Sequence, residues 1–498
     1  MISSRLSLRY SIYTSVLSSN WIIHPSDRME SRIKIAAIVA VAVIIIAGAG
    51  AFLLAGGDDD KGGIDITKSG NYLKIFGNAN GDHLLDDNDI GIIQDYIDGK
   101  IPESDLIKVT DADGKDYYLA DANTDGVIDG KDIEFFKGVI DRTNRYMYLF
   151  DSYNHLDAVP MNAQRIACDY FGDAELLMLV GAQSRIVATT HALIVLKDYY
   201  LQGAPSDIVD YRSRTTPDFE AVAEVDPEIW VTTSDYKAKY SPNTNAVVVG
   251  LSMLTFDLED VMSSPCLTSV LLAGYIFDNV KKAMDYVNWY LDTWHMLYDK
   301  TSGLSDSDRP DVFYTGYSNN VTNPSEQRLR YFPGNTGPYQ AVVLAGGHNI
   351  IDDYPGGVAP APSPTGGVYI DLEWISEQKY DYLFAHCTRY TGTGGISASV
   401  PDHGYICDDP SFLKEGQAAL GDVKVLGYGC DAENMYCTPG DYMNGASGGL
   451  LTAVLVASCI HPDLFPDLSL QEEHQKYIDM LGFDYDLSRH GVFFVTNG

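Results

Sequence analysis

The feature that most constrains this chain is an uncharged apolar run, Ile35 to Ala55, near its amino end. At about 1.5 Å of rise per residue, a helix of this length crosses a hydrocarbon core of roughly 30 Å. Basic residues precede the run and the aspartates 58–60 come after it. Because a basic flank stays in the cytoplasm, we expect the remainder of the chain to lie outside the cell. A cleaved signal peptide is the alternative interpretation.

We therefore assign residues 29–57 to a single-pass transmembrane anchor in the cell membrane, with an extracytoplasmic large domain. A second methionine, Met29, stands just before the basic flank of this segment. Residues 1–28 differ in character from the rest of the chain. We interpret them as an extra N-terminal tail and assign them no function.

The charge balance excludes one class of partner. The chain has 69 acidic against 34 basic residues, and a formal net charge of −35. A surface this acidic repels phosphate backbones, so we expect no nucleic-acid partner, while divalent cations are favoured. Among the seven cysteines, the pairs Cys387 and Cys407, and Cys430 and Cys437, are close in sequence. Each pair is compatible with a disulfide outside the cell or with free thiols.

Residues 64–146 contain two Asp- and Asn-rich loops, each followed by an apolar helical pattern. Side-chain oxygens fall at loop positions 1, 3, 5, 9 and 12, and position 7 offers its main-chain carbonyl. Such a set can surround one calcium ion; a pair of polar turns is the alternative. The expected ligands are Asn78, Asn80, Asp82, Leu84, Asp86 and Asp89 in the first loop, and Asp121, Asn123, Asp125, Val127, Asp129 and Asp132 in the second.

The segment resembles dockerin-like modules, whose loops share the D-x-N-x-D pattern and end in Asp at position 12. The resemblance implies a small α-helical domain of the EF-hand type, two structural calcium ions and a possible cohesin-like partner. Asn78 replaces the usual Asp at position 1, so we expect the first loop to bind calcium more weakly. The insert from Val109 to Tyr118 lengthens the gap between the loops, which leaves a purely structural role for calcium as the alternative.

From about Ala158 onward, short β-branched and aromatic runs alternate with helical patterns. This order is typical of an α/β fold with mainly parallel sheets. The expected strands are 185–189, 229–232, 246–249, 311–314, 382–385 and 423–426.

The large domain also repeats itself loosely. In its first half, Asp218-Phe-Glu220 and a short helical pattern lead into a strand at Ile229, and in its second half Asp371-Leu-Glu373 leads into a strand at Tyr382. Apolar residues recur at helical spacing between the halves. We therefore expect two lobes, 158–277 and 309–498, joined by a single long helix over 278–303.

Residues 158–498 resemble the substrate-binding proteins of ABC importers for iron–siderophores, haem and cobalamin (the periplasmic-binding type III family). Leu176 to Val187 is similar to the family's LGA-x-x-R-IVG segment, and Asp218 to Pro227 is similar to its NLE…KPD element. Gly346 to Asn349 is similar to its GGxN turn, and Tyr442 to Pro462 to its C-terminal helix. The order and spacing of these segments carry the resemblance.

This resemblance implies two Rossmann-like lobes joined by one helix, a metal-chelate or corrinoid ligand, and a permease with ATPase subunits as partners. By position, Glu220 and Glu373 correspond to the glutamates that dock onto arginines of the permease. Carboxylates on both lobes suit a two-fold partner. The alternative is that each is an ordinary Glu favoured by a helix N-terminus.

Ligands of open α/β sheets bind beyond the carboxyl ends of the strands. Aromatic faces in these loops suit a flat macrocycle or a catecholate, and arginines suit an anionic chelate. His191 and His386 could coordinate the metal of the chelate or be ordinary surface residues. The candidate ligand-binding residues are Thr190, His191, Tyr211, Arg212, Arg214, Tyr236, Tyr317, His386, Arg389, Tyr390 and Tyr428.

The chain has no H-E-x-x-H zinc motif and no Walker phosphate loop. We expect it not to be an enzyme. The alternative function is a cell-surface adhesion or scaffold protein that uses the dockerin-like module for protein–protein attachment.

Overall fold

A computed structural model describes residues 73–320, 328–355, 367–390, 399–401, 404–406, 408, 429–438 and 440–493. These residues belong to one compact unit, 66–498. The N-terminal tail and the expected anchor over 29–57 lie outside the described residues. Within the described ranges, no helix is long and apolar enough to cross a membrane.

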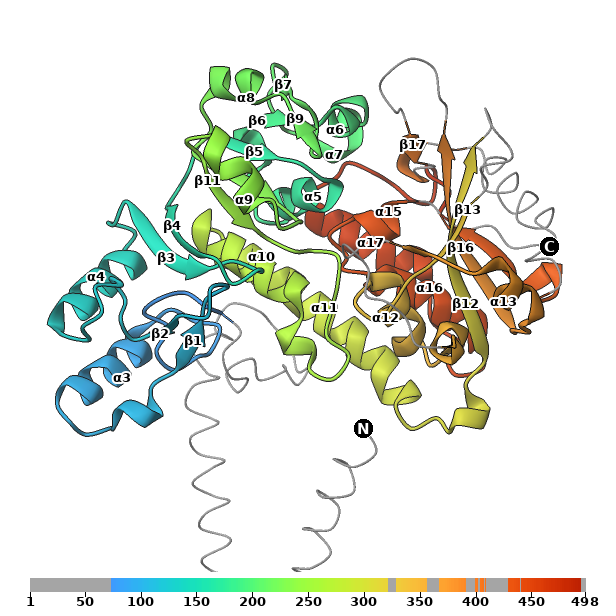
Figure 1. The fold of residues 1–498 in the computed structure, drawn as a ribbon, viewed down its shortest axis with the longest axis horizontal. Coiled ribbons are helices and arrows are strands. Elements are labelled where there is room, and N and C mark those ends of the chain that lie inside the picture. Colours follow the sequence, from blue (N-terminus) through green and yellow to red (C-terminus); the bar gives the residue numbers. More distant parts are fainter. Residues whose placement is uncertain are drawn as a thin grey trace, which may run out of the picture. The chain divides into compact units, whose positions relative to one another are not determined.

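The first part of the unit is a small helical module (Figure 1). Its two helices, α3 (Asp87–Ile97) and α4 (Gly130–Ile140), pack against each other. Each begins with a capping box, in which the N-cap aspartate and the third helical residue satisfy each other's main-chain N–H groups. The insert between the loops forms an antiparallel hairpin of β1 (Lys108–Thr110) and β2 (Asp116–Tyr118). A second hairpin, β3 (Tyr146–Phe150) and β4 (Leu156–Pro160), comes after the module.

The first lobe is built on a five-stranded, wholly parallel sheet in the order β11-β10-β5-β6-β7. Its strands are β5 (Ile166–Cys168), β6 (Ile186–Thr189), β7 (Val209–Asp210), β10 (Ile229–Thr232) and β11 (Val247–Gly250). The short hairpin of β8 (Arg212–Ser213) and β9 (Thr216–Pro217) comes after β7. The helices of the first lobe are α5 (Phe171–Leu179), α6 (His191–Val195), α7 (Lys197–Tyr200), α8 (Phe219–Val225), α9 (Lys237–Tyr240) and α10 (Pro265–Ile276).

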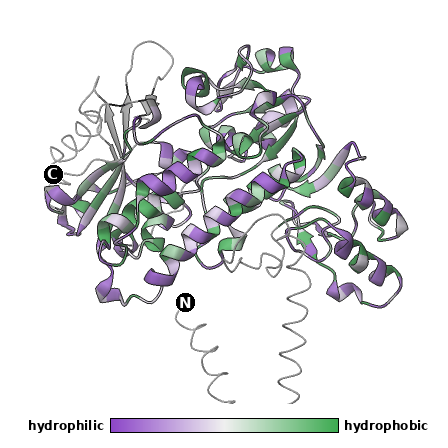
Figure 2. Ribbon diagram, turned by 180° about the vertical axis from the view of Figure 1, so that it is seen from behind, coloured by the Kyte–Doolittle hydropathy of each residue, from purple (hydrophilic) through white to green (hydrophobic). Residues whose placement is uncertain are grey.

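The long helix α11 (Val280–Thr301) lies between the two sheets in sequence, within the range expected for the linking helix. Polar and apolar residues alternate along it, as Figure 2 shows. Its buried face includes Tyr286, Tyr290, Trp294 and Leu297, which recur at the three- and four-residue spacing of one helix face. This face packs on α10 and on three later helices, α12 (Gly337–Leu344), α16 (Leu450–Ile460) and α17 (Leu470–Leu481), so α11 contributes to the core of both halves.

The C-terminal half contains a mixed sheet of seven strands within the described residues. Its central strands, β12 (Asp311–Asn320) and β16 (Tyr382–Tyr390), are parallel, and β14 (His348–Asn349) and β18 (Met435–Thr438) run parallel to them. The antiparallel pairings involve β13 (Arg328–Tyr331), β15 (Val368–Tyr369) and β17 (Ser399–Pro401). The helices are α12 (Gly337–Leu344), α13 (Leu372–Glu377), α15 (Asp441–Asn444), α16 (Leu450–Ile460) and α17 (Leu470–Leu481).

The α/β fold expected from the sequence is confirmed, with longer strands β12 and β16 than the apolar runs indicated. The expected strand 423–426 lies outside the described residues. Cys430 and Cys437 are free thiols in the structure, so the disulfide between them is not formed.

The two halves are joined by a buried carboxyl group. Glu175, on the fully buried helix α5, accepts hydrogen bonds through Oε2 from the Tyr477 hydroxyl of α17 (2.6 Å) and from the main-chain N–H of Ala446. Nearby, the Tyr200 hydroxyl of α7 donates to Oδ1 of Asp441 (2.5 Å). Burial raises the pKa of Glu175 to about 8, so this group is largely protonated at neutral pH.

Glu175 should make the stability of the chain depend on pH. Its pKa is raised on folding from about 4.5 to about 8, so its stabilising contribution, complete below about pH 4.5, is lost as pH rises to about 8. Glu175→Gln, which cannot ionise, should match wild type near pH 5. It should be more stable by several kcal/mol near pH 8, since each pKa unit corresponds to about 1.4 kcal/mol. Urea unfolding between pH 5 and 8.5 measures this.

The matched control is Glu472→Gln, an exposed glutamate in the first turn of α17. It should parallel wild type over the same range. If the Glu175→Gln curve also runs parallel to wild type, Glu175 is ionised in the folded protein and the assignment is wrong.

Candidate ligand-binding site

All five strands of the first sheet end at the same edge, because they are parallel. The residues directly after them are Asp169 after β5, Thr190 after β6, Tyr211 after β7 and Thr233 after β10. Thr190 and Tyr211 are two of the eleven candidate ligand residues, and two more, His191 and Arg212, come directly after them. This edge of the sheet is therefore the candidate ligand-binding site.

Two carboxyl groups lie together at this edge. Asp169 is 1% and Asp173 is 0% exposed, and Asp173 lies in the first turn of α5. Burial raises the pKa of both groups, and the negative charge of Asp169 raises that of Asp173 further. The positive charge of Arg214 acts in the opposite direction on both. Since two adjacent buried carboxyls do not both ionise readily, we assign at least one proton to the pair at neutral pH.

Arg214, whose charge acts on both carboxyl groups of this pair, contacts the ring of Tyr170. The guanidinium carbon of Arg214 lies 4.0 Å from the centroid of the Tyr170 ring, in cation–π contact. The Tyr240 hydroxyl donates to Oδ2 of Asp169 (2.9 Å). The Tyr170 hydroxyl donates to Oδ1 of Asn444 on α15 (2.5 Å), so the site in the first lobe is tied directly to the C-terminal half.

His191 begins α6 and is held by a carboxylate. Its Nδ1 lies 2.6 Å from Oδ2 of Asp210, and Oδ1 of the same aspartate accepts the main-chain N–H of Arg212 (2.8 Å). A carboxylate at Nδ1 favours the tautomer in which Nε2 carries the lone pair, which is the arrangement found behind metal-ligating histidines. His191 is half-exposed, so Nε2 is chemically suited to coordinate a metal.

The other candidates in the first lobe differ in accessibility. Tyr211 is fully buried, its hydroxyl donates to Cys168 O (2.8 Å), and its ring packs on Trp230. Its environment is thus that of a core residue. Arg212 is 74% exposed and lies 3.6 Å from Asp218. Tyr236 packs its ring against Tyr240, with 5.1 Å between centroids.

In the C-terminal half, the candidates lie on the two central strands. β12 and β16 pair in parallel with Gly316 opposite His386, so Tyr317 and the residues 386–390 share the carboxyl end of this sheet. His386 is buried. Arg389 and Tyr390 are placed by their backbone on β16. Tyr428 lies outside the described residues.

Four residues of this region were not predicted from the sequence: Asp169, Tyr170, Asp173 and Asn444. A signal for the first three was present, because Asp169-Tyr-Phe-Gly-Asp173 comes directly after the strand β5. Asn444 is 274 residues from Tyr170, and no local pattern indicated that pairing.

In the second of the expected calcium loops, aspartate side chains accept hydrogen bonds from main-chain N–H groups of the same loop. Asp121 accepts the N–H groups of Asp125 (3.1 Å) and Gly126 (2.9 Å), and Asp132 accepts those of Asn123 (3.1 Å) and Asp129 (2.8 Å). Asp125 accepts the N–H of Val127 (3.0 Å). Gly126, at position 6, has φ +88°, a backbone conformation that suits the sharp turn of calcium loops.

The first loop differs in two respects. His83 occupies position 6 in place of glycine, and the Asn78 amide donates to the carbonyls of Leu73 (2.7 Å) and Asp82 (2.8 Å). Asp89 accepts the N–H groups of Asn80 (3.1 Å) and Asp86 (3.0 Å), and burial raises its pKa to about 7. The N–H of Leu84 bonds to Asp82 (2.7 Å).

Within the described part of the chain, no group of three or more His, Cys, Asp or Glu side chains is placed so that it could hold a metal ion. Half of the ligands expected in the first loop are amide or main-chain oxygens, which such a group does not include. Four of the six ligands expected in the second loop are aspartates, and in this structure their carboxylates do not form such a group either.

The two expected docking glutamates occupy matching positions. Glu220 is in the first turn of α8, whose N-cap Asp218 accepts the N–H of Ala221 (3.2 Å). Glu373 is in the first turn of α13, whose N-cap Asp371 accepts the N–H of Glu373 (2.9 Å). Both glutamates are exposed. Neither carboxylate has a hydrogen-bond or ion-pair partner among the residues with described side chains.

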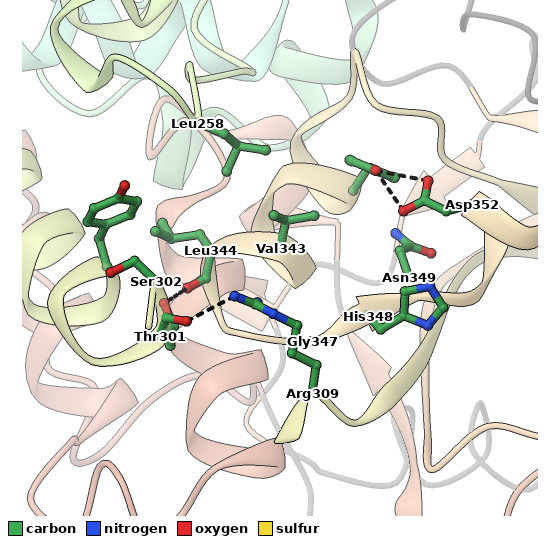
Figure 3. Close-up of a pocket in the computed structure, with 12 residues that line it drawn as sticks. Leu258, Thr301, Ser302, Arg309, Val343, Leu344, Gly347, His348, Asn349 and Asp352 are labelled. Carbon is green, nitrogen blue, oxygen red and sulfur yellow. Dashed lines mark hydrogen bonds between the residues drawn. The ribbon is translucent and has the colours of Figure 1, made fainter. Parts of the chain in front are cut away.

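A separate cavity of about 370 Å³ lies between the end of α11, α12 and β14 (Figure 3). Its polar groups are largely paired: Arg309 donates to Thr301 O (3.0 Å), and the Tyr339 hydroxyl lies 2.9 Å from the carboxylate oxygens of Asp352. His348 binds Asp311 (2.8 Å), the first residue of β12. The cavity therefore borders the amino end of this sheet, opposite the edge at which α/β proteins bind ligands.

Residues Gly445 to Gly449 match the G-x-S-x-G pattern of hydrolases. Ser447 is buried (1% exposed) and comes after helix α15. A nucleophile elbow instead exposes its serine on a turn between a strand and a helix. We assign no catalytic role to Ser447.

Comparison with known proteins now identifies the fold. Residues 166–400 match the model of a family described as periplasmic binding protein. No protein with a curated description matches the chain. The TroA-like periplasmic binding protein FepB from Veillonella parvula aligns over 70% of this chain and 99% of its own, with 15% identity and a TM-score of 0.50. The large domain therefore has the α/β fold of periplasmic binding proteins.

Two further structures align over a similar length. CeuE from Helicobacter pylori, in a Ni–His complex, is 11% identical over 69% of this chain and 97% of its own, with a TM-score of 0.48. The molybdate-bound MolA from Haemophilus influenzae is 13% identical over 68% and 99%, also with a TM-score of 0.48.

The charge of Arg214 should matter most when the carboxyl pair ionises. Arg214→Gln should destabilise the chain by up to about 1.4–4 kcal/mol more at pH 8 than at pH 5, since a neighbouring arginine lowers a carboxyl pKa by about 1–3 units and each unit corresponds to about 1.4 kcal/mol. Arg212→Gln, in the same hairpin but exposed, is the control and should show no such difference. Chemical denaturation at both pH values measures it. An equal cost of Arg214→Gln at both pH values would contradict the assignment.

Proposed function

We propose that this chain is an extracytoplasmic solute-binding protein of an ABC importer. It captures an iron chelate, haem or a corrinoid between its lobes and delivers it to a permease with ATPase subunits. The matching of Glu220 and Glu373 is the observation that carries this proposal. Each glutamate is exposed and unpaired within the described residues, and lies in the first turn of a short helix that leads into a strand of its lobe's sheet.

The chemistry of the first lobe supports a metal chelate as ligand. His191, backed by Asp210, offers Nε2 to a metal. Arg214 supplies a positive charge for an anionic chelate, and Tyr170 and Tyr236 supply aromatic faces. These groups come from loops at the carboxyl edge of one sheet, which is where open α/β sheets bind their ligands.

The double variant Glu220→Ala with Glu373→Ala tests docking. Removing one member of an interfacial ion pair costs about 2–5 kcal/mol, so uptake and transporter-stimulated ATP hydrolysis should fall at least about tenfold. Folding and ligand affinity should remain nearly unchanged, because a helix-end glutamate contributes only about 0.3–1 kcal/mol to its own domain.

The control is Glu224→Ala with Glu377→Ala, which removes the exposed glutamates near the other ends of the same two helices. This pair should transport normally. Normal transport by the Glu220 and Glu373 variant as well would show that these carboxylates are ordinary helix-end residues.

We also propose that the module binds calcium, most strongly at the loop from Asp121 to Asp132. The turn at Gly126 and the carboxylate at position 1 support this assignment. The first loop has a neutral amide at position 1 in place of a carboxylate, so it should bind calcium more weakly. Anchoring through residues 29–57 is proposed from the sequence alone.

Calcium should raise the melting temperature of the full chain. A ligand at about 100 times its Kd stabilises the folded state by about 2.7 kcal/mol. Asp121→Ala should abolish most of the gain, Asn78→Ala should abolish little of it, and Asp113→Ala, an exposed residue in the turn between β1 and β2, should leave it intact. Calorimetry in calcium and in EDTA measures this; identical melting of wild type in both would sink the proposal.

The adhesion alternative has no specific support. A tethering module is expected to be separable from its passenger domain, whereas Leu73 and Phe136 of this module lie in the same buried cluster as Ile166 and Cys168 of the first lobe.

A further inference from the structure

The hairpin of β3 and β4 connects the module to the first lobe and contacts the carboxyl ends of two strands of its sheet. At β11, the N–H of Gly250 donates to Oδ2 of Asp151 (2.9 Å), and the N–H of Ser152 donates to Gly250 O (2.8 Å). At β10, the Tyr153 hydroxyl donates to Thr233 O (2.5 Å). The turn of the hairpin is thus bonded to the edge at which we place the ligand.

Three further contacts join the hairpin to residues 233–237. Nε2 of His155 lies 3.7 Å from Oδ1 of Asp235. Asp157 forms an ion pair with Lys237, and Lys237 also donates to Leu156 O (3.3 Å). This ion pair is sheltered, with side-chain exposures of 7% for Asp157 and 25% for Lys237. Because it is sheltered, it should be screened little by salt.

The packing around Tyr153 leaves little freedom. A Cβ on Gly250 would lie 2.5 Å from Cδ2 of Tyr153, closer than carbon atoms approach in proteins. The Tyr153 ring therefore occupies the space that a side chain at position 250 would need. The end of β11 and the turn of the hairpin are therefore in close contact, with no room for a larger residue at position 250.

The module itself is bonded to the first lobe at a second place, the end of α10. The Tyr275 hydroxyl of α10 donates to His83 O (2.9 Å) and accepts the N–H of Leu85 (3.1 Å), both in the first loop. Arg142 donates to Asn162 Oδ1 (3.0 Å) and to Ile276 O (3.2 Å). With two anchor points, the module holds the hairpin in a fixed place.

The segment 233–237 leads from β10 into α9 and carries Tyr236. The Tyr236 ring packs on Tyr240, and the Tyr240 hydroxyl holds Asp169 of the carboxyl pair. A continuous set of contacts therefore runs from Tyr153 to the centre of the candidate site.

We propose that residues 151–157 are a positioning element of the ligand site, with Tyr153 holding the loop 233–237 at the edge of the cleft. The inference rests on the proposed function in one respect, that the ligand binds at this edge. Tyr153 is a positioning residue; the module to which it is attached becomes part of the binding head, rather than a spacer before it.

The test compares Tyr153→Phe with the matched control Tyr146→Phe, on β3 of the same hairpin, in the full-length chain. The first readout is amide hydrogen exchange in residues 234–240. Losing one hydrogen bond should speed exchange there about fivefold, within the two- to tenfold range that a net bond of about 0.5–1.5 kcal/mol implies. Tyr146→Phe should exchange like wild type.

The second readout is the Kd for three probes: haemin, cyanocobalamin and a ferric tris-catecholate. For a probe that wild type binds, Tyr153→Phe should raise Kd about fivefold while its melting temperature stays close to that of Tyr146→Phe. Asp235→Asn, which alters an exposed contact of the same loop, should act in the same direction and serves if Tyr153→Phe does not fold.

Unchanged exchange in 234–240 would overturn the inference, and so would faster exchange with an unchanged Kd. If wild type binds none of the three probes, the proposed ligand class is wrong; the exchange comparison still decides whether Tyr153 holds the loop. The two proposals therefore fail in different ways.

Discussion

The buried carboxyl of Glu175 is the interaction on which the two-lobed arrangement depends. It lies on a helix with no exposed face and is bonded to Tyr477 and Ala446 of the other half. Tyr200 with Asp441, and Tyr170 with Asn444, add two more hydrogen bonds between the halves. Separating the halves would leave these polar groups without partners, at a cost of about 1–3 kcal/mol for each buried group. Together with the continuous core around α11, they fix the relation of the two lobes.

Local patterns allowed much of this fold to be predicted, and long-range pairing explains what was missed. The three- and four-residue spacing of apolar residues indicated α11, and the repeated Asp-x-Glu elements indicated α8 and α13 with the strands after them. Glu175 and Tyr477 are 302 residues apart, and no local periodicity reports such a contact. Tyr211 shows a second limit: its position after β7 suggested a ligand residue, but only the packing of Trp230 against it reveals that it is buried. The two calcium-type loops show a third, since similar sequences give different geometry once His83 replaces the glycine of position 6.

The N-terminal module packs against the first lobe rather than standing apart from it. It shares a buried cluster with the first lobe and is bonded to α10, and the hairpin that comes after it is bonded to the loop after β10. Calcium binding in the module would therefore stabilise the same structure that holds the ligand loop. The strongly acidic composition fits this account at two levels: carboxylates in the loops suit a divalent cation, and exposed carboxylates on α8 and α13 suit a permease with basic docking sites.

The most direct test of the central claim is the visible absorption spectrum and metal content of the full-length chain isolated from its native source. A solute-binding protein for metal chelates should carry one equivalent of a coloured ligand or bind it from spent growth medium. The spectrum should show a haem, corrinoid or ferric catecholate band, with a matching equivalent of iron or cobalt. A colourless, metal-free protein that remains so after exposure to such medium would contradict the account.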